Sequence, residues 1–319
     1  MRRAQPIADV VANQQTTPEL RQRLQRVLQI RRFAIDELKL PDNGSYLEYA
    51  DLKRPYVVWS VFATPEFSLK PIQSCFPIVG CMSYRGYFVE AEANKAAAQL
   101  AEAGNDVYVG GVAAYSTLGW FEDPIVNSML RWDEARLAKL IFHEMAHQQV
   151  YANGDSDFNE AFATAVGEIG LRRWLVANQA SSITSDQQHA WAQSNARQQD
   201  FLSLVKQTAG RLRKLYQLQA DEGAMRAAKA EIMASMRSKY QQLRDGRWRG
   251  YDGYDDWFAT ANNARIAAVA TYHDQVPNFL ALYEQLGQDL QAFYRECERA
   301  AKTNVEERRV WQRRYASTD

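Results

Sequence analysis

Two histidines and a glutamate stand at a spacing that could hold a metal ion. In the segment LIFHEMAHQQV, His143 and His147 are four residues apart, with Glu144 beside the first. Positions i and i+4 share one face of an α-helix, so both imidazoles can point at one ion while Glu144 projects toward the same pocket. Zinc bound by two imidazoles and a third protein ligand keeps an open position for water, whose pKa it lowers to about 7. The spacing therefore predicts a zinc hydrolase in which Glu144 takes the proton of the attacking water and passes it to the leaving amine.

The third ligand is expected on the helix that follows. Asn153 and Gly154 supply a turn, and Asp155, Ser156 or Asp157 can cap a new helix that carries Glu160, 13 residues after His147. The face of Glu160 also bears residues small enough for another helix to approach closely: Ala163, Thr164, Gly167 and Gly170. This pattern favours Glu160 as the ligand that completes the zinc site.

Other interpretations of these acidic residues stay open. Glu160 could form a capping box with Asp157 and only fix the start of its helix. Asp155 is the main rival as third ligand. Glu168, two turns beyond Glu160, suits the role of a second carboxylate that orients a ligand histidine.

The elements that must position these residues fall into three regions. Residues 18–39 repeat apolar positions at helical spacing after a Thr-Pro start, and short β-branched and aromatic runs from 55 to 117 enclose an alanine-rich helix near 90–103. From about residue 132 onward the pattern is helical, with long stretches at 186–244 and 275–316. We expect an α+β fold, mainly helical, with a small mixed sheet and a long C-terminal helical hairpin. The expected division is a catalytic region at 1–180 and a helical region at 181–319 that packs on it.

The long C-terminal helices have two interpretations. Their apolar stripe, which includes Phe201, Val205 and Leu212, suits packing of a helical hairpin against the rest of the core. The alternative is a surface for a protein partner or a membrane. The polar faces mix both signs of charge rather than carrying Lys and Arg alone, which favours the packing interpretation.

The overall charge and hydropathy exclude several classes of protein. The 38 basic and 38 acidic residues cancel, so no general field attracts nucleic acid or an anionic membrane. No apolar run approaches the roughly 20 residues that a spanning helix needs, and the N-terminal MRRAQPIADV lacks the apolar core of a signal peptide. The chain as given is expected to be soluble.

Two of the three cysteines could form a disulfide. Cys75 and Cys81 flank a short turn in SCFPIVGCMSY, whereas Cys297 lies in a charged helical pattern. A disulfide would imply an oxidising compartment. Two reduced cysteines that pack as small apolar residues fit the spacing equally well.

The chain also resembles a known family of metallopeptidases. HEMAH followed by FNEAFAT is similar to gluzincins, in which a glutamate of an Asn-Glu-x-Phe-Ala type segment completes the His-Glu-x-x-His site. Four segments resemble the bacterial predicted-aminopeptidase family of zinc-dependent, gluzincin-like metallopeptidases: PDNGSYLEYADLKRPYVVWSVFATPEFSL, YVGGVAAYSTLGWFEDP, HEMAHQQVYANGDSDFNEAFAT and NNARIAAVATYHDQVPNF. The resemblance implies a zincin-like fold, one zinc ion held by His143, His147 and Glu160, and Glu144 as the base.

The resemblance further implies a location in the bacterial envelope. Members of that family commonly bear a lipoprotein signal, so the full-length form is expected to be periplasmic or anchored to the membrane by a lipid. The sequence as given carries no such signal. The expected anchor would therefore precede residue 1.

Two features of an aminopeptidase are not fixed by the motifs. Gluzincin aminopeptidases typically hold the free amine of the substrate with a glutamate on the edge strand before the zinc helix, but GGVAAYSTLG has no acid. Its small residues would still let a peptide pair with that strand. Tyr272 and His273 in VATYHDQVP, and Tyr115 on the expected edge strand, are candidates to stabilise the oxyanion. For each of them, the commoner alternative is an aromatic side chain packed in the core with its polar group hydrogen-bonded.

The sequence predicts a zinc-dependent peptidase that hydrolyses peptide bonds, and the resemblance implies an aminopeptidase located in the bacterial cell envelope. Its expected partner is a peptide substrate and not nucleic acid. The alternative is a non-catalytic binding or scaffold protein that retains a peptidase-like site and engages a protein partner through its C-terminal helices.

Overall fold

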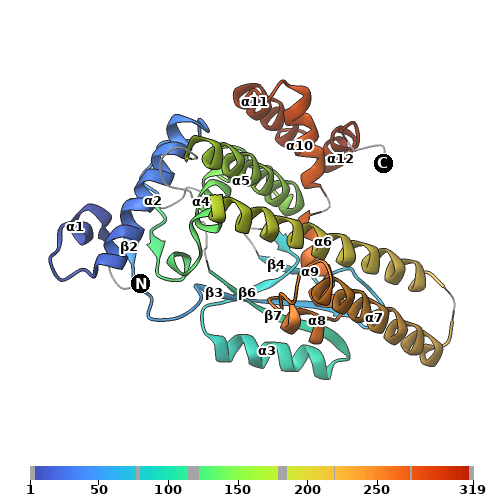
Figure 1. The fold of residues 1–319 in the computed structure, drawn as a ribbon. Coiled ribbons are helices and arrows are strands. Elements are labelled where there is room, and N and C mark those ends of the chain that lie inside the picture. The colour runs from blue at the N-terminus through green and yellow to red at the C-terminus, as the bar shows by residue number, and fades with distance from the viewer. Residues whose placement is uncertain are drawn as a thin grey trace. The chain divides into compact units, whose positions relative to one another are not determined.

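The computed structural model describes residues 4–76, 80–113, 122–178, 185–218, 220–273 and 275–315. The described chain is mainly helical with small sheets (Figure 1), which confirms the expected α+β class. It divides into two compact units, each built from segments that are not consecutive in sequence. The first unit comprises Met1–Val58, Gly111–Thr184 and Asp274–Asp319, and the second comprises Trp59–Gly110 and Ser185–His273. The boundary at residue 180 stays a prediction from the sequence pattern.

The first unit contains the segment with the two histidines. Its elements are β1 (Gln5–Pro6), α1 (Ile7–Ala12), α2 (Pro18–Asp36), β2 (Glu48–Ala50), β8 (Ile125–Val126), the 3-10 turn η1 (Met129–Arg131), α4 (Glu134–Ala146), α5 (Ser156–Asn178), α10 (Val276–Gln285), α11 (Leu290–Ala301) and α12 (Val305–Arg313). Strand β2 pairs antiparallel with β1 and parallel with β8, so this small sheet is mixed.

Helices α2 and α4 begin where the sequence places capping residues. Thr17 precedes Pro18 at the start of α2, and its side chain accepts a hydrogen bond from the backbone N–H of Leu20. The carboxylate of Asp133 accepts from the backbone N–H of Arg136 at the start of α4. Both contacts satisfy backbone donors that a helix start otherwise leaves without partners.

Helix α4 packs against both α2 and α5 in the core of the first unit (Figure 1). Its buried residues recur at helical spacing: Leu137, Ala138, Ile141, Phe142, Met145 and Ala146. Helix α5 is buried along most of its length, as expected for a helix with neighbours on several sides. Close packing on both helices leaves little freedom for the side chains that they present to each other.

Two glycines of α5 allow this close approach, as the small residues in the sequence predicted. A Cβ atom on Gly167 would lie 3.0 Å from the backbone oxygen of Lys139 in α4. One on Gly170 would lie 2.6 Å from a methyl carbon of Leu38 and 2.6 Å from a ring carbon of Phe142. Leu38 and Phe142 are fully buried, so neither can move aside without displacing other core residues.

Gly170→Ala should therefore destabilise the protein. Overpacking a core destabilises a protein by about 1–3 kcal/mol. Replacing glycine by alanine inside a helix stabilises it by roughly 1 kcal/mol. We therefore expect the free energy of unfolding to fall by up to about 2 kcal/mol. Gly210→Ala is the matched control, because a Cβ there would meet nothing within 4 Å, and it should stabilise the chain. Urea denaturation of both variants measures the difference, and equal effects would contradict this account of the glycines.

The second unit is a sheet with helices. Its elements are β3 (Val58–Pro65), β4 (Ser74–Phe76), β5 (Gly80–Met82), β6 (Arg85–Tyr87), α3 (Glu90–Glu102), β7 (Asn105–Val112), α6 (Ser185–Leu215), α7 (Glu222–Asp245), α8 (Asp255–Ala259) and α9 (Asn263–His273). The main sheet has the strand order β6-β3-β7, and β4 pairs with β5. Helix α3 covers one face of the main sheet (Figure 1). It matches the alanine-rich helix expected near 90–103.

The helical hairpin differs in extent from the expectation. Helices α6 and α7 pack against each other within the second unit, while the stretch expected to be helical from 275 to 316 forms the three short helices α10, α11 and α12 of the first unit. Gly287 and Gln288 adopt positive φ angles after α10, and the side chains of Asp289 and Asn304 cap the starts of α11 and α12. The turn and the two caps divide the segment into separate helices, although its apolar residues recur at helical spacing throughout.

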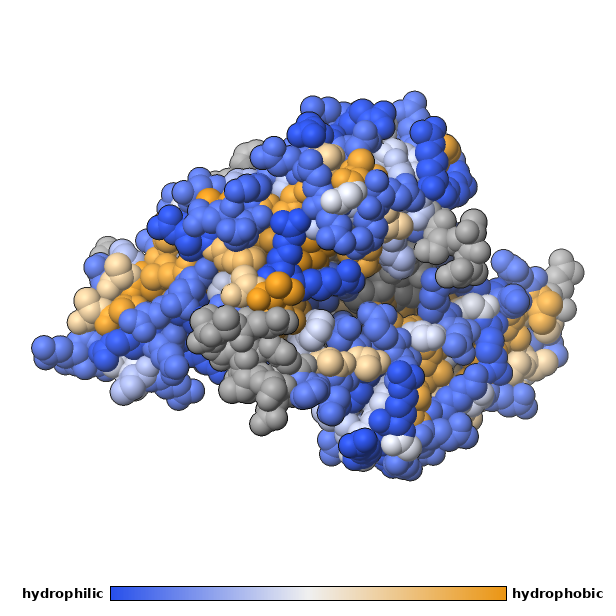
Figure 2. Space-filling view, turned by 45° about the horizontal axis from the view of Figure 1, so that its top comes forward, coloured by the Kyte–Doolittle hydropathy of each residue, from blue (hydrophilic) through white to orange (hydrophobic). Residues whose placement is uncertain are grey.

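One face of the molecule is mostly hydrophilic. Figure 2 shows blue areas over most of one face, interrupted by smaller orange areas. Among the helices that the structure describes, none is both long and apolar enough to cross a bilayer.

Candidate metal centre

Helix α4 presents both histidines of the motif toward one point. His143 and His147 lie one turn apart, and His147 is the C-cap residue that directly follows the helix. Their Nε2 atoms are 3.2 Å from each other, and the two rings are nearly perpendicular, at 88°. The local geometry of a helix thus brings two ring nitrogens together, as the i, i+4 spacing predicted.

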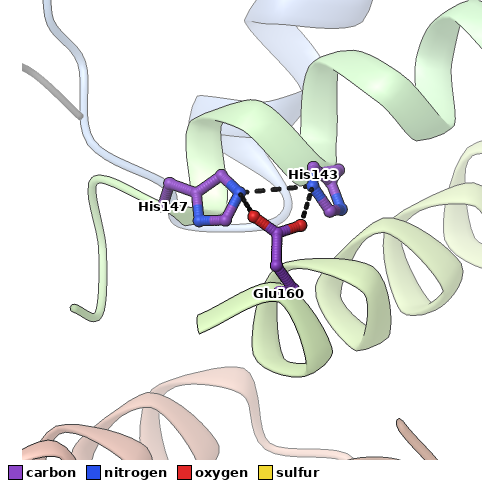
Figure 3. Close-up of side chains that lie close together, drawn as sticks. All are labelled: His143, His147 and Glu160. Atoms are coloured by element: carbon purple, nitrogen blue, oxygen red, sulfur yellow. Dashed lines mark hydrogen bonds and ion pairs between the residues drawn. The ribbon is translucent and has the colours of Figure 1, made fainter. Parts of the chain in front are cut away.

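Helix α5 brings a carboxylate to the same point. The chain reverses at Gly154, which has a φ of +74°, and α5 starts at Ser156. Figure 3 shows Glu160 rising from α5 toward the two imidazoles of α4. Its Oε2 lies 3.4 Å from Nε2 of His143, and its Oε1 lies 3.7 Å from Nε2 of His147.

The separations of these atoms are close to those between the ligands of one zinc ion. Nitrogen and oxygen ligands about 2.0–2.2 Å from Zn²⁺ in a tetrahedron lie about 3.3–3.6 Å from each other. The three observed separations of 3.2, 3.4 and 3.7 Å are close to that range. Two imidazoles with one carboxylate also form a donor set used by catalytic zinc sites.

Charge and burial favour protonation states that suit a cation at this point. Burial lowers the pKa of His147 to about 4, and the charge of His143 acts in the same direction. Burial raises the pKa of Glu160, but its hydrogen bond to His143 and the charges of both histidines outweigh that effect and lower it. Near neutral pH, His147 is thus a neutral imidazole and Glu160 an anion, the states in which these groups bind metals.

His143 is held differently from His147. Burial lowers the pKa of His143, but its hydrogen bond to Glu160 and the charges of Glu144 and Glu160 outweigh that effect and raise it. A proton on His143 would compete with a metal ion for its ring nitrogen. The Nδ1 atom of His143 lies 3.4 Å from the hydroxyl oxygen of Thr164 on α5. A proton on Nδ1 that is shared with this hydroxyl leaves Nε2 free to face the cluster.

Thr164, like Glu160, contacts a ligand histidine from α5, whereas Glu168 pairs with basic residues. The sequence suggested that Glu168 orients a histidine, but its Oε1 lies 3.3 Å from the ammonium of Lys139, and its Oε2 lies 4.0 Å from Arg172. Both basic residues compete for the carboxylate. The i, i+4 relation between Glu160 and Thr164 placed the threonine on the correct face, but only the packing of α5 on α4 brings it to His143.

Asp155 is engaged at the start of α5. Its Oδ1 accepts a hydrogen bond from the backbone N–H of Phe158 at 3.1 Å, and its Oδ2 accepts one from Arg308 at 2.8 Å. Asp155 is thus the cap of the helix. This engagement favours Glu160 over Asp155 as the third ligand, and it leaves the carboxylate of Glu160 to face the histidines.

Glu144 lies beside the cluster in a partly buried position. Burial raises its pKa to about 7, the charge of His143 opposes this shift, and the charges of Glu160 and Asp123 reinforce it. Asp123 is buried in the same unit. A carboxylate whose pKa is close to the working pH can both accept and return a proton.

The structure does not describe the side chains of the three residues proposed to stabilise the oxyanion. Tyr115 lies outside the described residues. Tyr272 and His273 belong to the last turn of α9 in the second unit, and the structure describes only their backbone. Their proposed role stays a prediction from the sequence.

The cysteines can be placed in part. Strands β4 and β5 pair Cys75 opposite Cys81, and Cys75 is disulfide-bonded. Cys297 is free and buried in α11. Among the described residues, His143, His147 and Glu160 form the one group of three metal-binding side chains close enough to share an ion.

Comparison with known proteins identifies a family. No curated protein and no solved structure gives a significant match to the chain. A family model described as "Putative aminopeptidase" matches residues 1–311, which include the second unit, most of the first unit and the whole cluster. The match therefore covers nearly all of the sequence, and the chain belongs to the Aminopep family of putative aminopeptidases.

Proposed function

We propose that the protein is a zinc-dependent peptidase of the bacterial cell envelope, with aminopeptidase activity, whose metal is held by His143, His147 and Glu160. The observation that carries the proposal is the meeting of two imidazole nitrogens and one carboxylate within 4.8 Å of one another. The family match supports hydrolysis of peptides. The separations of the ligand atoms, the neutral state of His147 and the anionic state of Glu160 support the zinc site.

Each residue of the cluster has a role in this proposal. Zinc, when bound, supplies Lewis acidity that favours attack of water on a peptide carbonyl. His143 and His147 bind through Nε2, and Thr164 orients the ring of His143. The carboxylate of Glu160 contributes the one anionic ligand. Glu144, on the turn of α4 that carries both histidines, accepts a proton from the attacking water and returns it to the nitrogen of the leaving amine.

The oxyanion formed by this attack needs a hydrogen-bond donor or a positive charge near it. Tyr115, Tyr272 and His273 are proposed for that role on the strength of the sequence. The anchor for the substrate's free amine is a separate requirement. The small residues Gly110 and Gly111 near the end of β7 would let a peptide backbone pair with that strand.

The location in the envelope has one structural support. Cys75 is disulfide-bonded, and disulfides persist mainly in oxidising compartments such as the bacterial periplasm. This is consistent with the envelope location that the family resemblance implies.

Cleavage of a mixed peptide pool tests the proposed activity. Wild-type protein loaded with Zn²⁺ should cleave peptides, and removal of the metal with a chelator should abolish cleavage until Zn²⁺ is restored. Mass spectrometry of the product ends separates removal of N-terminal residues from cleavage inside the chain. Absence of cleavage across a broad pool, despite bound Zn²⁺, would contradict a peptidase and favour a binding protein that retains the site.

A further inference from the structure

A buried arginine from the C-terminal helix contacts the start of α5. Arg308, in the first turns of α12, has a side chain that is only 3% exposed. Its Nε donates a hydrogen bond to Oδ2 of Asp155 at 2.8 Å. Its Nη1 donates to the backbone carbonyls of Ala301, at 3.0 Å, and Thr303, where α11 gives way to α12. A buried guanidinium must keep such acceptors, because a charge without partners is costly inside a protein.

Asp155 links this arginine to the backbone of α5. One carboxylate oxygen accepts from Arg308, while the other accepts from the backbone N–H of Phe158. The backbone carbonyl of Asp155 also accepts from the backbone N–H of Asn159 at 3.1 Å. The charge of Arg308 thus acts on the same side chain that orders the first turn of the helix.

Phe158 adds a second contact between the same elements. The guanidinium carbon of Arg308 lies 5.8 Å from the centre of the Phe158 ring, within range of a cation–π interaction. The ring also packs against Phe279 of α10 and Trp311 of α12, at centroid distances of 5.2 and 6.1 Å. The first turn of α5 is therefore enclosed by the C-terminal helices.

The same turn is also bound to the segment that follows His147. The buried amide of Asn159 accepts from the backbone N–H of Ala152 at 2.7 Å and donates to the carbonyl of the same residue at 2.9 Å. Glu160 is the next residue. The backbone that leads into Glu160 is thus fixed by two sets of contacts, one with the segment after α4 and one through Asp155 with Arg308.

We propose that Arg308 is a positioning residue for Glu160, through which the C-terminal helix α12 fixes the third metal ligand against the two histidines. The inference rests on the proposed zinc site and extends it to a residue 153 positions away from Asp155 in the sequence. Loss of Arg308 removes the partner of Asp155, so the first turn of α5 and the carboxylate of Glu160 lose part of their fixed geometry. Metal affinity then falls because the ligands no longer converge before the metal binds.

Arg308→Gln and Asp155→Asn test the two ends of this contact, with Arg173→Gln as the matched control. Arg173 also ties α5 to the C-terminal helices, but at its far end: its Nη2 donates to the hydroxyl of Tyr283 at 2.7 Å and to the carbonyl of Gln288 at 2.8 Å. Two measurements are made on full-length protein: Zn²⁺ affinity by competition with a chromophoric chelator, and the visible absorption spectrum of the protein loaded with Co²⁺. The spectrum reports the geometry of the metal ligands directly. A general loss of stability would not alter that geometry in the folded protein.

We expect Arg308→Gln and Asp155→Asn to weaken Zn²⁺ binding by about 10- to 100-fold, the usual effect of removing a residue that supports a metal ligand. Their Co²⁺ spectra should differ from that of the wild type, and Arg173→Gln should match the wild type in both measurements. Wild-type affinity and spectrum in both test variants, or an equal loss in Arg173→Gln, would overturn the inference. Asp155→Asn keeps the test decisive if Arg308→Gln does not fold, because asparagine has nearly the same shape and retains an oxygen for Phe158. A wild type that binds no Zn²⁺ would instead overturn the proposed function, and this inference with it.

Discussion

Glu144→Gln should retain the metal and lose the activity. Glutamine has nearly the shape of glutamate, so α4 and the two histidines beside it keep their positions, but the amide cannot accept the proton of the attacking water. General acid–base catalysis contributes about 10²- to 10⁴-fold, and we expect the loss of kcat at or above the upper end of that range. Peptide affinity should change little, because the proposed role of Glu144 is proton transfer and not binding.

Three samples measure this effect on one peptide pool: wild type, Glu144→Gln, and wild type treated with a chelator. The metal content of each sample is the control, since Glu144→Gln must hold as much Zn²⁺ as wild type for its kcat to report proton transfer. Equal rates for wild type and Glu144→Gln would show that another group acts as the base.

Glu160→Ala should remove the third ligand and most of the zinc affinity. Residues that only support a metal ligand typically contribute about 10- to 100-fold to affinity, so loss of a direct ligand should exceed about 100-fold. The remaining two imidazoles lie on one turn of α4 and can bind an ion only from one side. Equilibrium dialysis against buffered Zn²⁺ measures the affinity.

Glu168→Ala is the control for this variant, because it removes a carboxylate from the same helix that pairs with Lys139 and Arg172 instead. It should bind Zn²⁺ nearly as well as wild type. Full retention of Zn²⁺ by Glu160→Ala would return Glu160 to a structural role at the start of α5.

The sequence predicted the part of the site that depends on local helix geometry. The spacing of His143 and His147 sets their common face on any α-helix, and the structure has both Nε2 atoms together. The turn at Gly154 and the small residues of α5 were also visible in the sequence, so the meeting of Glu160 with the histidines could be expected. These features need only the periodicity of a helix and a short turn.

The residues that hold this geometry in place were not visible in the sequence. Arg308 meets Asp155 across 153 positions, and no local pattern links an arginine in a charged C-terminal segment to a helix cap. Thr164 and Glu168 lie one turn apart on α5. The way α5 packs on α4 determines that Thr164 contacts His143 and that Glu168 contacts Lys139. Long-range pairing of this kind depends on tertiary contacts that periodicity does not encode.

For the same reason, the sequence did not reveal which segments belong to which of the two units. Helical periodicity at 275–316 resembles that at 186–244, yet the structure assigns Asp274–Asp319 to the first unit and Ser185–His273 to the second. The mixed charges of both stretches gave no sign of different partners. The short helices α10 and α12 enclose Phe158 near the metal ligand, so the C-terminal segment contributes to the proposed site rather than forming one arm of a hairpin.

The central claim, a zinc ion held by His143, His147 and Glu160, is tested most directly by anomalous X-ray scattering from crystals of the wild-type protein. Diffraction data collected on both sides of the zinc absorption edge locate the metal and identify it as zinc. The account predicts one strong anomalous peak per chain, at the point where the two Nε2 atoms and the carboxylate of Glu160 meet. Zinc-supplemented crystals with no peak at that point, or with a peak bound by other residues, would contradict it.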